Sequence, residues 1–503
     1  MNAWSGGYVT DVDYIAGYYP EQSPFVLALA CLISGFATDV MERRDTLHYM
    51  ELGCGRGRNA LVAAAANPGW RVTAVDFNPA AIAEARVTAA AAGLDNITFL
   101  EADLAALAGS EAAAAIPEVD VVSMHGVWSW VPEPVRQGII RLLRDKVRAG
   151  GLVQVSYNVL PGLQGALGMQ RLLRLSGTAL ASRSDRQAMA GQGVVRELLA
   201  AGAVHLADQK TVGALLQAME KAPVAYLAHE YMNDTWYPCF HSDVADAMAG
   251  AKLDYAAAPR LPENFPELMM NEPQRAIYDR FDDGRLRELV KDMCSSRGLR
   301  HDVYVRGARR LSPEARDQAL RELTLTLAVA PERFIFKLDM PAGEATLAEA
   351  FYRPVTEALA ERPHSVEELL SLPALAGRSD NPVETVAMLV GTLQAALVAR
   401  PDAVADVRLR RFNAVLARQN VQRERLNAPL VAASTRLGGG LPCRGVELFL
   451  LERIGATGGG VDPGIWAAEL GHDLPPDEVT RLREVLINVL RERLPIWRNA
   501  GLV

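Results

Sequence analysis

Three closely spaced glycines in the stretch "ELGCGRGRN" are the first residues whose types and spacing could do chemistry. Gly53, Gly55 and Gly57 follow the apolar run "LHYM" and give the pattern GxGxG. Glycine has no Cβ atom, so such a loop can adopt positive φ and bring a ligand against backbone N–H groups. The next helix is expected to begin at about Asn59, which points its N-terminal dipole at the same ligand. The glycines alone are a weak signal, because GxGxG occurs in many turns.

Carboxylates at predicted strand ends narrow the choice of ligand. Asp76 ends "VTAVD", about 20 residues after the glycines, where an acid holds ribose hydroxyls. Glu51 precedes the loop and suits a positively charged amino group better than a pyrophosphate, and Asp103 in "FLEAD" can accept from an adenine amino group. Amine, ribose and adenine contacts together describe S-adenosylmethionine (SAM), with a dinucleotide as the alternative. The predicted cofactor-binding residues are Glu51, Gly53, Cys54, Gly55, Gly57, Asn59, Asp76, Phe77, Asp103, Leu104 and His125.

The stretch "HGVWSWVP" has the composition of a methyl-acceptor site. His125 is expected to end a strand at the cofactor edge, and Trp128 and Trp130 follow on the adjoining loop. Aromatic faces attract a cationic acceptor, and the sulfonium itself, by cation–π contact. A structural histidine that bonds a carbonyl, and tryptophans that only fill the core, are the alternatives. Trp128 and Trp130 are therefore predicted to bind the substrate.

Tyr157 and Asn158 are expected to end the next strand, opposite His125 across the sheet edge. An amide or a phenol there could accept from an acceptor amine, so His125, Tyr157 and Asn158 are the predicted catalytic residues. Their alternative role is to cap the turn at Pro161. In-line methyl transfer needs alignment above all, and we expect alignment rather than a dedicated base.

Two further clusters could line the site. Tyr14, Tyr18 and Tyr19 in "DYIAGYY" form a lid over the donor or pack the N-terminal helix on the domain. His229, followed by Glu230 and Tyr231, has a weaker case for lining an acceptor channel; adjacent His and Glu do not have metal-ligand spacing. Of these, the predicted substrate-binding residues are Tyr18, Tyr19 and His229.

These residues need a sheet to position them, and apolar runs alternate with helical stretches over residues 47–160. Such alternation predicts a parallel α/β sheet covered on both faces. Strands are expected at residues 47–52, 70–76, 96–103, 119–125 and 152–158. Helices are expected at residues 59–66, 79–94 and 132–147.

Beyond Pro161 the strand signals fade, and residues 164–320 have mainly helical patterns. We predict a SAM-binding domain over residues 1–180, a helical regulatory or substrate domain over 181–330, and an α+β domain over 331–503. The last has a pattern of helices typical of a small helix-turn-helix or winged-helix unit. Its helix "VETVAMLVGTLQAALV" carries no Arg or Lys, which favours protein contact or regulation over reading DNA.

Composition excludes several other classes. The 503 residues carry a net charge of −8 at pH 7, so a nucleic-acid partner is not indicated. Five scattered cysteines predict neither a disulfide framework nor a metal site. The start "MNAWSGGYVTDVDY" lacks a basic signal region, and the apolar run "PFVLALACLISGFA" is too short for a membrane span, so it reads as a buried helix. A cytoplasmic location is expected.

The motifs "ELGCGRGRN", "VDFNPAAIAEAR", "HGVWSWVPEPVR" and "VSYNVLPG" resemble class I SAM-dependent methyltransferases that carry a methyltransferase regulatory domain. That group includes protein-lysine methyltransferases of rickettsial outer-membrane proteins. "GYVTDVDYIAGYYPEQSP" and "YLAHEYMND" resemble family segments too, so the likeness covers about residues 4–260. It implies a seven-stranded Rossmann-like sheet, SAM as methyl donor and an acceptor pocket over the strand ends. The rickettsial proteins commonly have tyrosine at the position of Trp128 and tryptophan at the position of Leu163. These differences concern the acceptor pocket and not the cofactor site.

The expected function is methyl transfer from SAM to a macromolecule, most simply a protein lysine. More than 300 residues follow residue 180, far more than a small acceptor needs. A small-molecule or glycan acceptor is one alternative, and a non-catalytic SAM-sensing adaptor is another. The family resemblance also implies a possible homodimer.

Overall fold

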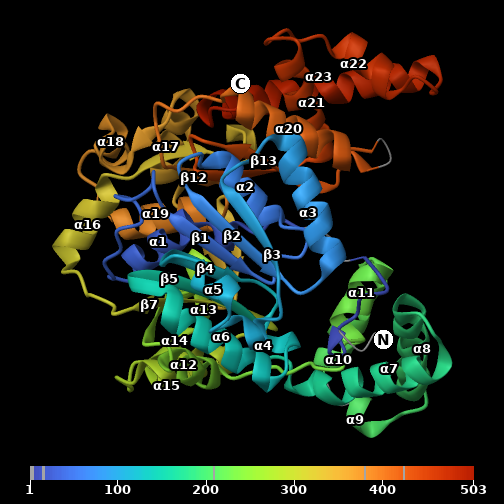
Figure 1. The fold of residues 1–503 in the computed structure, drawn as a ribbon. Coiled ribbons are helices and arrows are strands. Elements are labelled where there is room, and N and C mark those ends of the chain that lie inside the picture. Colours follow the sequence, from blue (N-terminus) through green and yellow to red (C-terminus); the bar gives the residue numbers. More distant parts are fainter. Residues whose placement is uncertain (1–4, 14–16, 208–209, 379–380, 423–424) are drawn as a thin grey trace.

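A seven-stranded sheet forms the centre of the molecule in the computed structural model, which describes residues 5–13, 17–207, 210–378, 381–422 and 425–503 (Figure 1). Its strand order is β3-β2-β1-β4-β5-β7-β6. Strands β1 to β5 are parallel, and β7 runs antiparallel to both β5 and β6. The predicted α/β class with seven strands is confirmed. The strands are β1 (His48–Leu52), β2 (Arg71–Asp76), β3 (Ile97–Glu101), β4 (Val119–Met124), β5 (Val147–Asn158), β6 (Leu253–Ala257) and β7 (Leu299–Arg306).

The first five strands and the helices between them agree with the sequence pattern. Helix α3 shows why: Asn78 accepts hydrogen bonds from the first turn, Pro79 begins the helix, and Gly93 ends it in the left-handed conformation. The helices around the sheet are α1 (Pro24–Ile33), α2 (Arg58–Ala66), α3 (Pro79–Ala92), α4 (Leu104–Leu107), α5 (Glu111–Ala114), α6 (Glu133–Lys146), α12 (His241–Ala249), α13 (Pro266–Met269), α14 (Glu272–Tyr278) and α15 (Gly284–Cys294).

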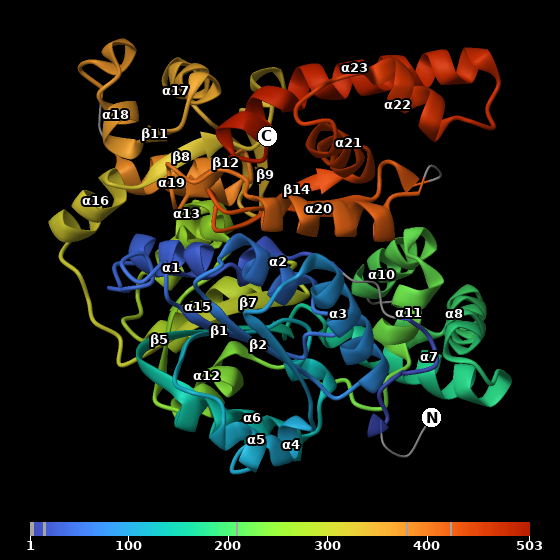
Figure 2. The same ribbon diagram turned by 45° about the horizontal axis from the view of Figure 1, so that its top comes forward.

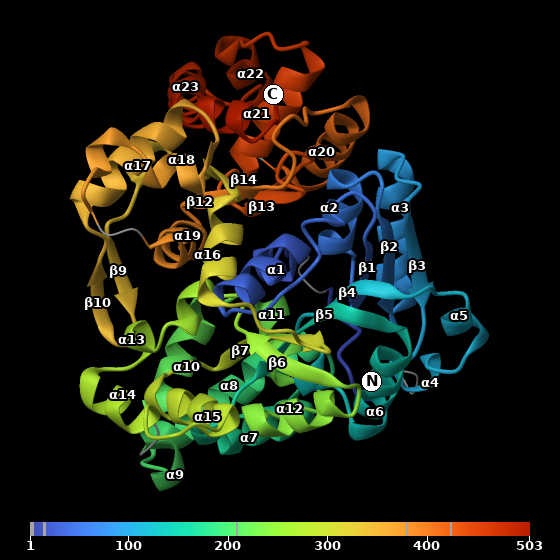
Figure 3. The same cartoon turned by 90° about the vertical axis from the view of Figure 1, so that its left-hand side faces the viewer.

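Strands β6 and β7 lie beyond the predicted domain boundary at residue 180. The prediction of mainly helical structure over residues 164–320 missed both strands, although they complete the catalytic sheet. Strand β7 contains the charged run Arg300, His301 and Asp302, all three of them fully buried. Viewed from the side, α12 and α15 lie on one side of these strands and α1 on the other (Figure 3).

A helical module projects from one side of the sheet, with its own apolar core. The N-terminal segment, residues 5–13, is bound to it: Ser184 Oγ donates to Asp11 (2.6 Å) and Asp234 N donates to the Gly7 carbonyl (2.9 Å). The predicted helical region therefore corresponds to this module and to the strand-bearing segment after it. The module comprises α7 (Leu167–Leu180), α8 (Ser184–Ala200), α9 (Val204–Ala207), α10 (Lys210–Lys221) and α11 (Val224–Tyr231).

The C-terminal region combines helices with small antiparallel sheets, as expected; its winged-helix character stays a prediction. One sheet has the order β11-β8-β12, and β9–β10 and β13–β14 form hairpins. The strands are β8 (Thr324–Leu327), β9 (Lys337–Met340), β10 (Gly343–Thr346), β11 (His364–Ser365), β12 (Ala395–Val398), β13 (Pro429–Ser434) and β14 (Gly439–Arg444). The helices are α16 (Pro313–Arg321), α17 (Glu349–Glu361), α18 (Val366–Leu370), α19 (Pro382–Gly391), α20 (Val407–Asn420), α21 (Gly445–Ala456), α22 (Pro463–Leu470) and α23 (Pro476–Asn499).

This region packs directly on the catalytic sheet's helices. Figure 2 shows α20 lying along α2 and α3. Arg400 donates to Asp45 (2.7 Å) and Asn67 (2.8 Å), and Arg58 donates to Asn420 (2.9 Å). A single apolar core runs from one face of the sheet through α1 and α2 into the C-terminal region. Across the described ranges, no helix has the length and apolar character that a membrane crossing requires.

Candidate active site

The glycine loop directly follows β1, and all three glycines have left-handed backbone conformations. Gly53, Gly55 and Gly57 have φ values of +70°, +52° and +70°. A Cβ at Gly57 would lie 2.7 Å from Phe99 Cε1, and one at Gly53 would run into the Val127 side chain. At Gly55 the space is open. The loop therefore packs against the protein at its two ends and leaves its middle free to meet a ligand.

Asp76 lies at the end of β2, directly beside this loop. One carboxylate oxygen accepts from the Gly55 N–H (2.7 Å) and the other from the Asn78 N–H (2.9 Å). Burial raises the pKa of its carboxyl group. A carboxylate has about four lone-pair positions, so both oxygens can still accept from ribose hydroxyls. Phe77 follows Asp76, and Tyr8 of the N-terminal segment meets its ring edge-on at 5.7 Å.

Glu51, at the end of β1, is a buried acid that can pair with the amino group of SAM. Its side chain is only 5% exposed, and burial, together with nearby Asp76, raises its pKa to about 8. Its Oε2 atom is buried and has no hydrogen-bond partner within the described residues. A buried carboxylate of this kind binds an ammonium group well, because the partner charge offsets its desolvation. The residues present thus fit the amino end of SAM.

The remaining predicted cofactor residues occupy different positions. Asp103 follows β3, is exposed, and uses one oxygen to cap α4 through the Ala105 N–H (2.8 Å). Leu104 is buried, and Cys54 is buried within the loop with its N–H donated to the Val75 carbonyl (3.0 Å). The edge position of Asp103 beside β2 is the one expected for an adenine contact, which stays a prediction.

The side chain of Asn59 binds the backbone of Tyr19. Its Nδ2 donates to the Tyr19 carbonyl (2.8 Å), and its Oδ1 accepts from the Tyr19 N–H (3.1 Å). The Tyr19 ring stacks on His125 with centroids 3.9 Å apart, and the His125 ring stacks on His301 at 5.3 Å. The first turn of α2 thereby positions a stack of three rings at the ends of β4 and β7.

The His125 imidazole is uncharged near neutral pH. Burial lowers its pKa to about 4. Its Nδ1 lies 3.2 Å from Ser156 Oγ, which in turn accepts from the Gly126 N–H (2.9 Å). A neutral ring does not repel a sulfonium or a cationic acceptor. The ring face of His125 is therefore suited to contact either cation, and the ring is not suited to accept a proton.

The two tryptophans of "HGVWSWVP" have different environments. Trp128 is 2% exposed, and its carbonyl accepts from Arg136 Nε (3.1 Å), which corresponds to the packing alternative. Trp130 is half-buried and stacks on Trp236, with centroids 6.5 Å apart. Asn158 Oδ1 accepts from Trp236 Nε1 (3.0 Å), so the amide at the end of β5 orients this second ring. Trp236 was missed in the sequence, although it follows the family-like segment "YLAHEYMND".

Tyr157 lies on the other face of β5 from Asn158. It is 1% exposed, and its hydroxyl donates to Asp302 (2.7 Å) within a buried group of charges that includes Arg300 and His241. The geometry thus gives no support to a catalytic role for Tyr157. The physical reason is the alternation of side chains along a strand, which directs neighbours to opposite faces.

Two predicted substrate residues hold other segments in place. The Tyr18 hydroxyl accepts from the Gly440 N–H (2.9 Å) in the β13–β14 hairpin, and burial raises its pKa to about 12. His229 Nε2 lies 2.8 Å from the Val12 carbonyl, and its ring is 5.8 Å from Tyr8. Tyr18 therefore links the site to the C-terminal region, and His229 links the helical module to the N-terminal segment. Tyr14 lies outside the described residues.

Helix α11 contributes an acid that the sequence indicated only weakly. Burial raises the pKa of Glu230 to about 7, and a hydrogen bond from Tyr226, one turn earlier, partly offsets this effect. Burial raises the pKa of Tyr8, and the nearby Asp76 and Glu230 charges raise it further. Burial also raises the pKa of Tyr226, with smaller contributions from Glu230 and Tyr19. Glu230 therefore lies near enough to Tyr8, and Tyr226 near enough to Tyr19, for their charges to interact.

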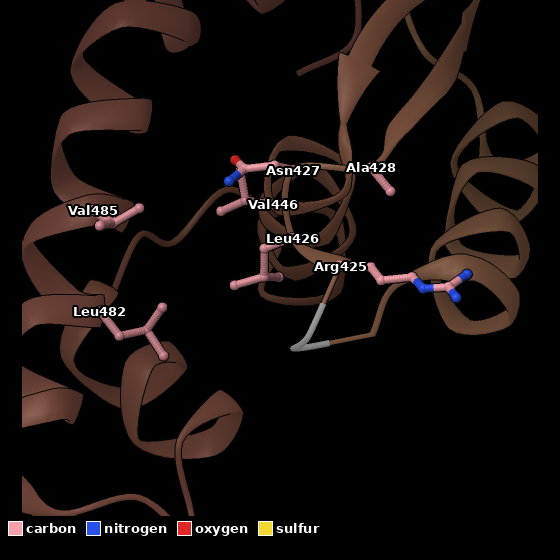
Figure 4. A pocket seen from close by; sticks show the side chains of 7 residues that line it. All are labelled: Arg425, Leu426, Asn427, Ala428, Val446, Leu482 and Val485. Atoms are coloured by element: carbon pink, nitrogen blue, oxygen red, sulfur yellow. The ribbon is translucent and has the colours of Figure 1, made fainter. Parts of the chain in front are cut away.

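Two other kinds of candidate site, a metal site and a hollow in the C-terminal region, do not involve the glycine loop in the described part of the chain. Within the described ranges no three His, Cys, Asp or Glu side chains are grouped so as to hold a metal ion. Figure 4 shows a hollow in the C-terminal region that shares no residue with the glycine loop. It is lined by Arg425, Leu426, Asn427, Ala428, Val446, Leu482 and Val485.

The strand order, the glycine loop after β1 and the acid after β2 define the class I SAM-dependent methyltransferases. Residues 50–153 match a methyltransferase domain family, and residues 223–306 match the family described as "Predicted methyltransferase regulatory domain". An uncharacterized protein of Synechocystis sp. is 32% identical over 370 residues, which cover 73% of this chain and 71% of the relative. The chain belongs to the SAM-dependent methyltransferases that carry a methyltransferase regulatory domain, and SAM is its methyl donor.

More distant relatives extend the likeness. An uncharacterized protein of Rickettsia prowazekii is 22% identical over 337 residues, 66% of this chain and 58% of the relative. The structure of PKMT2 from Rickettsia typhi in complex with AdoHcy superposes with a TM-score of 0.70 at 15% identity, covering 97% of this chain and 99% of that one. The fold is therefore shared over nearly the whole length, including the C-terminal region.

Proposed function

We propose that this protein methylates lysine side chains of a protein acceptor. The observations that carry the proposal are the Tyr19–His125 stack and the Trp130–Trp236 pair that Asn158 orients, together with the Glu230 carboxyl group, whose charge acts on Tyr8. Aromatic rings attract a lysine ammonium, and a carboxyl group that titrates near neutrality can take its proton. The full-length likeness to the fold of PKMT2 from Rickettsia typhi, with the resemblance of the sequence motifs to protein-lysine methyltransferases, supports the same acceptor.

The chain's own residues would hold the donor at the glycine loop. Glu51 pairs with the donor's amino group, Asp76 accepts from ribose hydroxyls, and the N–H groups around Gly55 line the loop. SAM supplies an activated methyl group on a sulfonium. Because the donor is already activated, the protein mainly contributes alignment, worth up to about 7–11 kcal/mol in ideal cases.

The acceptor side must bind an ammonium and then remove a proton from it. The aromatic rings contribute roughly 0.5–2 kcal/mol each by cation–π contact, and their low polarity lowers the ammonium pKa. Glu230 in its ionised form takes the proton from the acceptor nitrogen, whose lone pair then forms the new bond to the methyl carbon. The C–S bond of the donor breaks, its electron pair stays on sulfur, and AdoHcy leaves.

Incubation of the purified protein with tritiated SAM and a fractionated bacterial lysate tests this proposal. We expect label in acid-precipitable protein, removed by protease, and none with Gly55→Asp, whose side chain occupies the donor loop. Label confined to small molecules or glycans would overturn the protein acceptor. Binding of AdoHcy without label in any fraction would instead favour a SAM-sensing adaptor.

A further inference from the structure

Strand β7 brings a residue of the regulatory segment into the catalytic site. It lies within the matched residues 223–306 and pairs antiparallel with β5, which places His301 directly opposite Ser156. Paired residues point to the same face of a sheet. Ser156 Oγ contacts His125 Nδ1 at 3.2 Å, and the His301 ring stacks on the His125 ring at an interplanar angle of 25°. A residue of the regulatory segment therefore packs against the ring of His125.

A histidine at position 301 lowers the stability of the fold. His301 is 0% exposed, and neither ring nitrogen has a hydrogen-bond partner within the described residues. Burial, with the nearby Arg260 charge, lowers its pKa far below the usual range, so the ring is neutral. An unpaired buried polar group lowers stability, because nothing offsets its loss of hydration. An aliphatic side chain would avoid this cost, and such costs are characteristic of functional positions.

Unpaired polar atoms also recur in the neighbouring rows of the same face. Gln154, two residues before Ser156, is 0% exposed and has neither amide atom bonded within the described residues. Glu51, across Ser123 in the same row, has its unpaired Oε2. Five buried atoms that are unpaired in the described part of the chain, on Glu51, Gln154 and His301, thus lie in neighbouring rows of this sheet face.

We propose that His301 is a positioning residue for methyl transfer, through which the regulatory segment controls the reaction. Its flat ring fixes the plane of His125, and His125 with Tyr19 fixes the acceptor relative to the methyl group. Displacement of β7 along β5 would tilt the stack and reduce the rate without removing the donor site. This inference rests on the proposed function, because it assumes that His125 faces the acceptor.

His301→Leu in the full-length protein tests the role, because leucine removes both the ring and its unpaired nitrogens. The rate of protein labelling at saturating tritiated SAM should fall at least tenfold, while KM for SAM and the Kd for AdoHcy stay within about twofold. The melting temperature should not decrease. His301→Phe, which keeps a flat ring, should retain the rate within about threefold. A residue with a purely structural role would not separate rate from stability in this way.

His48→Leu is the matched control, because His48 is also a buried histidine of the sheet. Its two nitrogens contact the Glu118 carbonyl (3.0 Å) and Thr73 Oγ1 (2.9 Å), so its loss should lower the melting temperature and leave the rate of the folded protein within twofold. The ring contact has a separate readout, since the chain has only eight histidines: the His125 Cε1–H NMR signal should shift in His301→Leu.

The inference is overturned if His301→Leu keeps the wild-type rate, if its AdoHcy affinity falls with its rate, or if His301→Phe is as slow as His301→Leu. It is also overturned if His48→Leu slows the reaction equally. Absence of label with the wild-type protein would contradict the proposed function instead, so the two failures are distinguishable.

Discussion

Glu230 and Glu51 are carboxyl groups whose pKa values are raised by burial to about 7 and about 8. For Glu230, the ionised form is the one that accepts the acceptor's proton, so the methylation rate should rise with pH between about 6 and 8. Glu230→Gln should lower the rate at pH 8 about tenfold or more and remove that rise. Initial rates of label incorporation across this pH range measure both effects.

Glu220 on α10 provides the control for that experiment. It forms an exposed ion pair with Arg196 (2.8 Å), so Glu220→Gln should keep the wild-type rate and pH profile. A wild-type profile in Glu230→Gln would contradict the role of Glu230 as proton acceptor.

The raised pKa of Glu51 should make the free energy of unfolding depend on pH. Its folded pKa of about 8 lies above the ordinary value of 4.5, so the folded state binds the extra proton between those pH values. The free energy of unfolding therefore falls as pH rises through this window. Glu51→Gln should remove that fall and be more stable than wild type at pH 9 by up to about 3–5 kcal/mol.

The same substitution should weaken SAM binding about tenfold or more, because the amino group loses its partner charge. Chemical denaturation at pH 5 and pH 9, with calorimetric titration of SAM, measures the two effects. Unchanged SAM affinity in Glu51→Gln would contradict the assignment of Glu51 to the donor's amino end.

The sequence pattern predicts the position of the donor loop more directly than the positions of the side chains at the end of β5, for a physical reason. A glycine loop and the acid after the next strand have fixed positions relative to the backbone, so Gly55 and Asp76 meet as expected. At the end of β5 both faces of the strand are buried, and composition does not distinguish them. Tyr157 and Asn158 therefore looked equivalent in the sequence, yet only Asn158 reaches the aromatic pair.

At the scale of elements, β7 was missed because it has buried charges where an apolar run is expected. Arg300 pairs with Asp302 (2.7 Å), Asp292 (2.8 Å) and Glu288, so the charges compensate one another inside the fold. Such pairing between α15 and β7 is not visible in a local sequence pattern. By contrast, the helices and parallel strands of residues 47–160 are visible in the sequence as alternating apolar runs and helical stretches.

Removal of Arg300 should therefore be strongly destabilising. Arg300→Met removes the positive charge that three buried carboxylates share, which should cost about 3–5 kcal/mol in the free energy of unfolding. Arg285 forms an exposed pair with Asp246, and Arg285→Met should cost less than about 1 kcal/mol. Equal midpoints of the two variants in urea would contradict this account of β7.

At the scale of the whole molecule, the C-terminal region is part of the catalytic fold. Leu409, Phe412 and Leu416 of α20 belong to the same apolar core as Ala60 and Leu61 of α2. The hydrogen bond between Gly440 and Tyr18 extends this contact to the residue before Tyr19. The predicted boundary at residue 331 therefore separates segments that share a core.

A chain that ends at residue 330 should consequently lose its cooperative unfolding. The exposed faces of α1 and α2 should bind the dye ANS, and the affinity for AdoHcy should fall at least tenfold because α2 positions Asn59 and Tyr19. Calorimetry and AdoHcy titration measure these effects. A truncated protein with wild-type melting and affinity would show that the C-terminal region is an independent appendage.

Mass spectrometry of acceptor peptides, after reaction with SAM that carries a deuterated methyl group, tests the central claim most directly. The account predicts the heavy methyl on the Nζ atom of lysine, with the wild-type protein but not with Gly55→Asp. Heavy methyl groups on oxygen, on other side chains or only on non-protein molecules would contradict it.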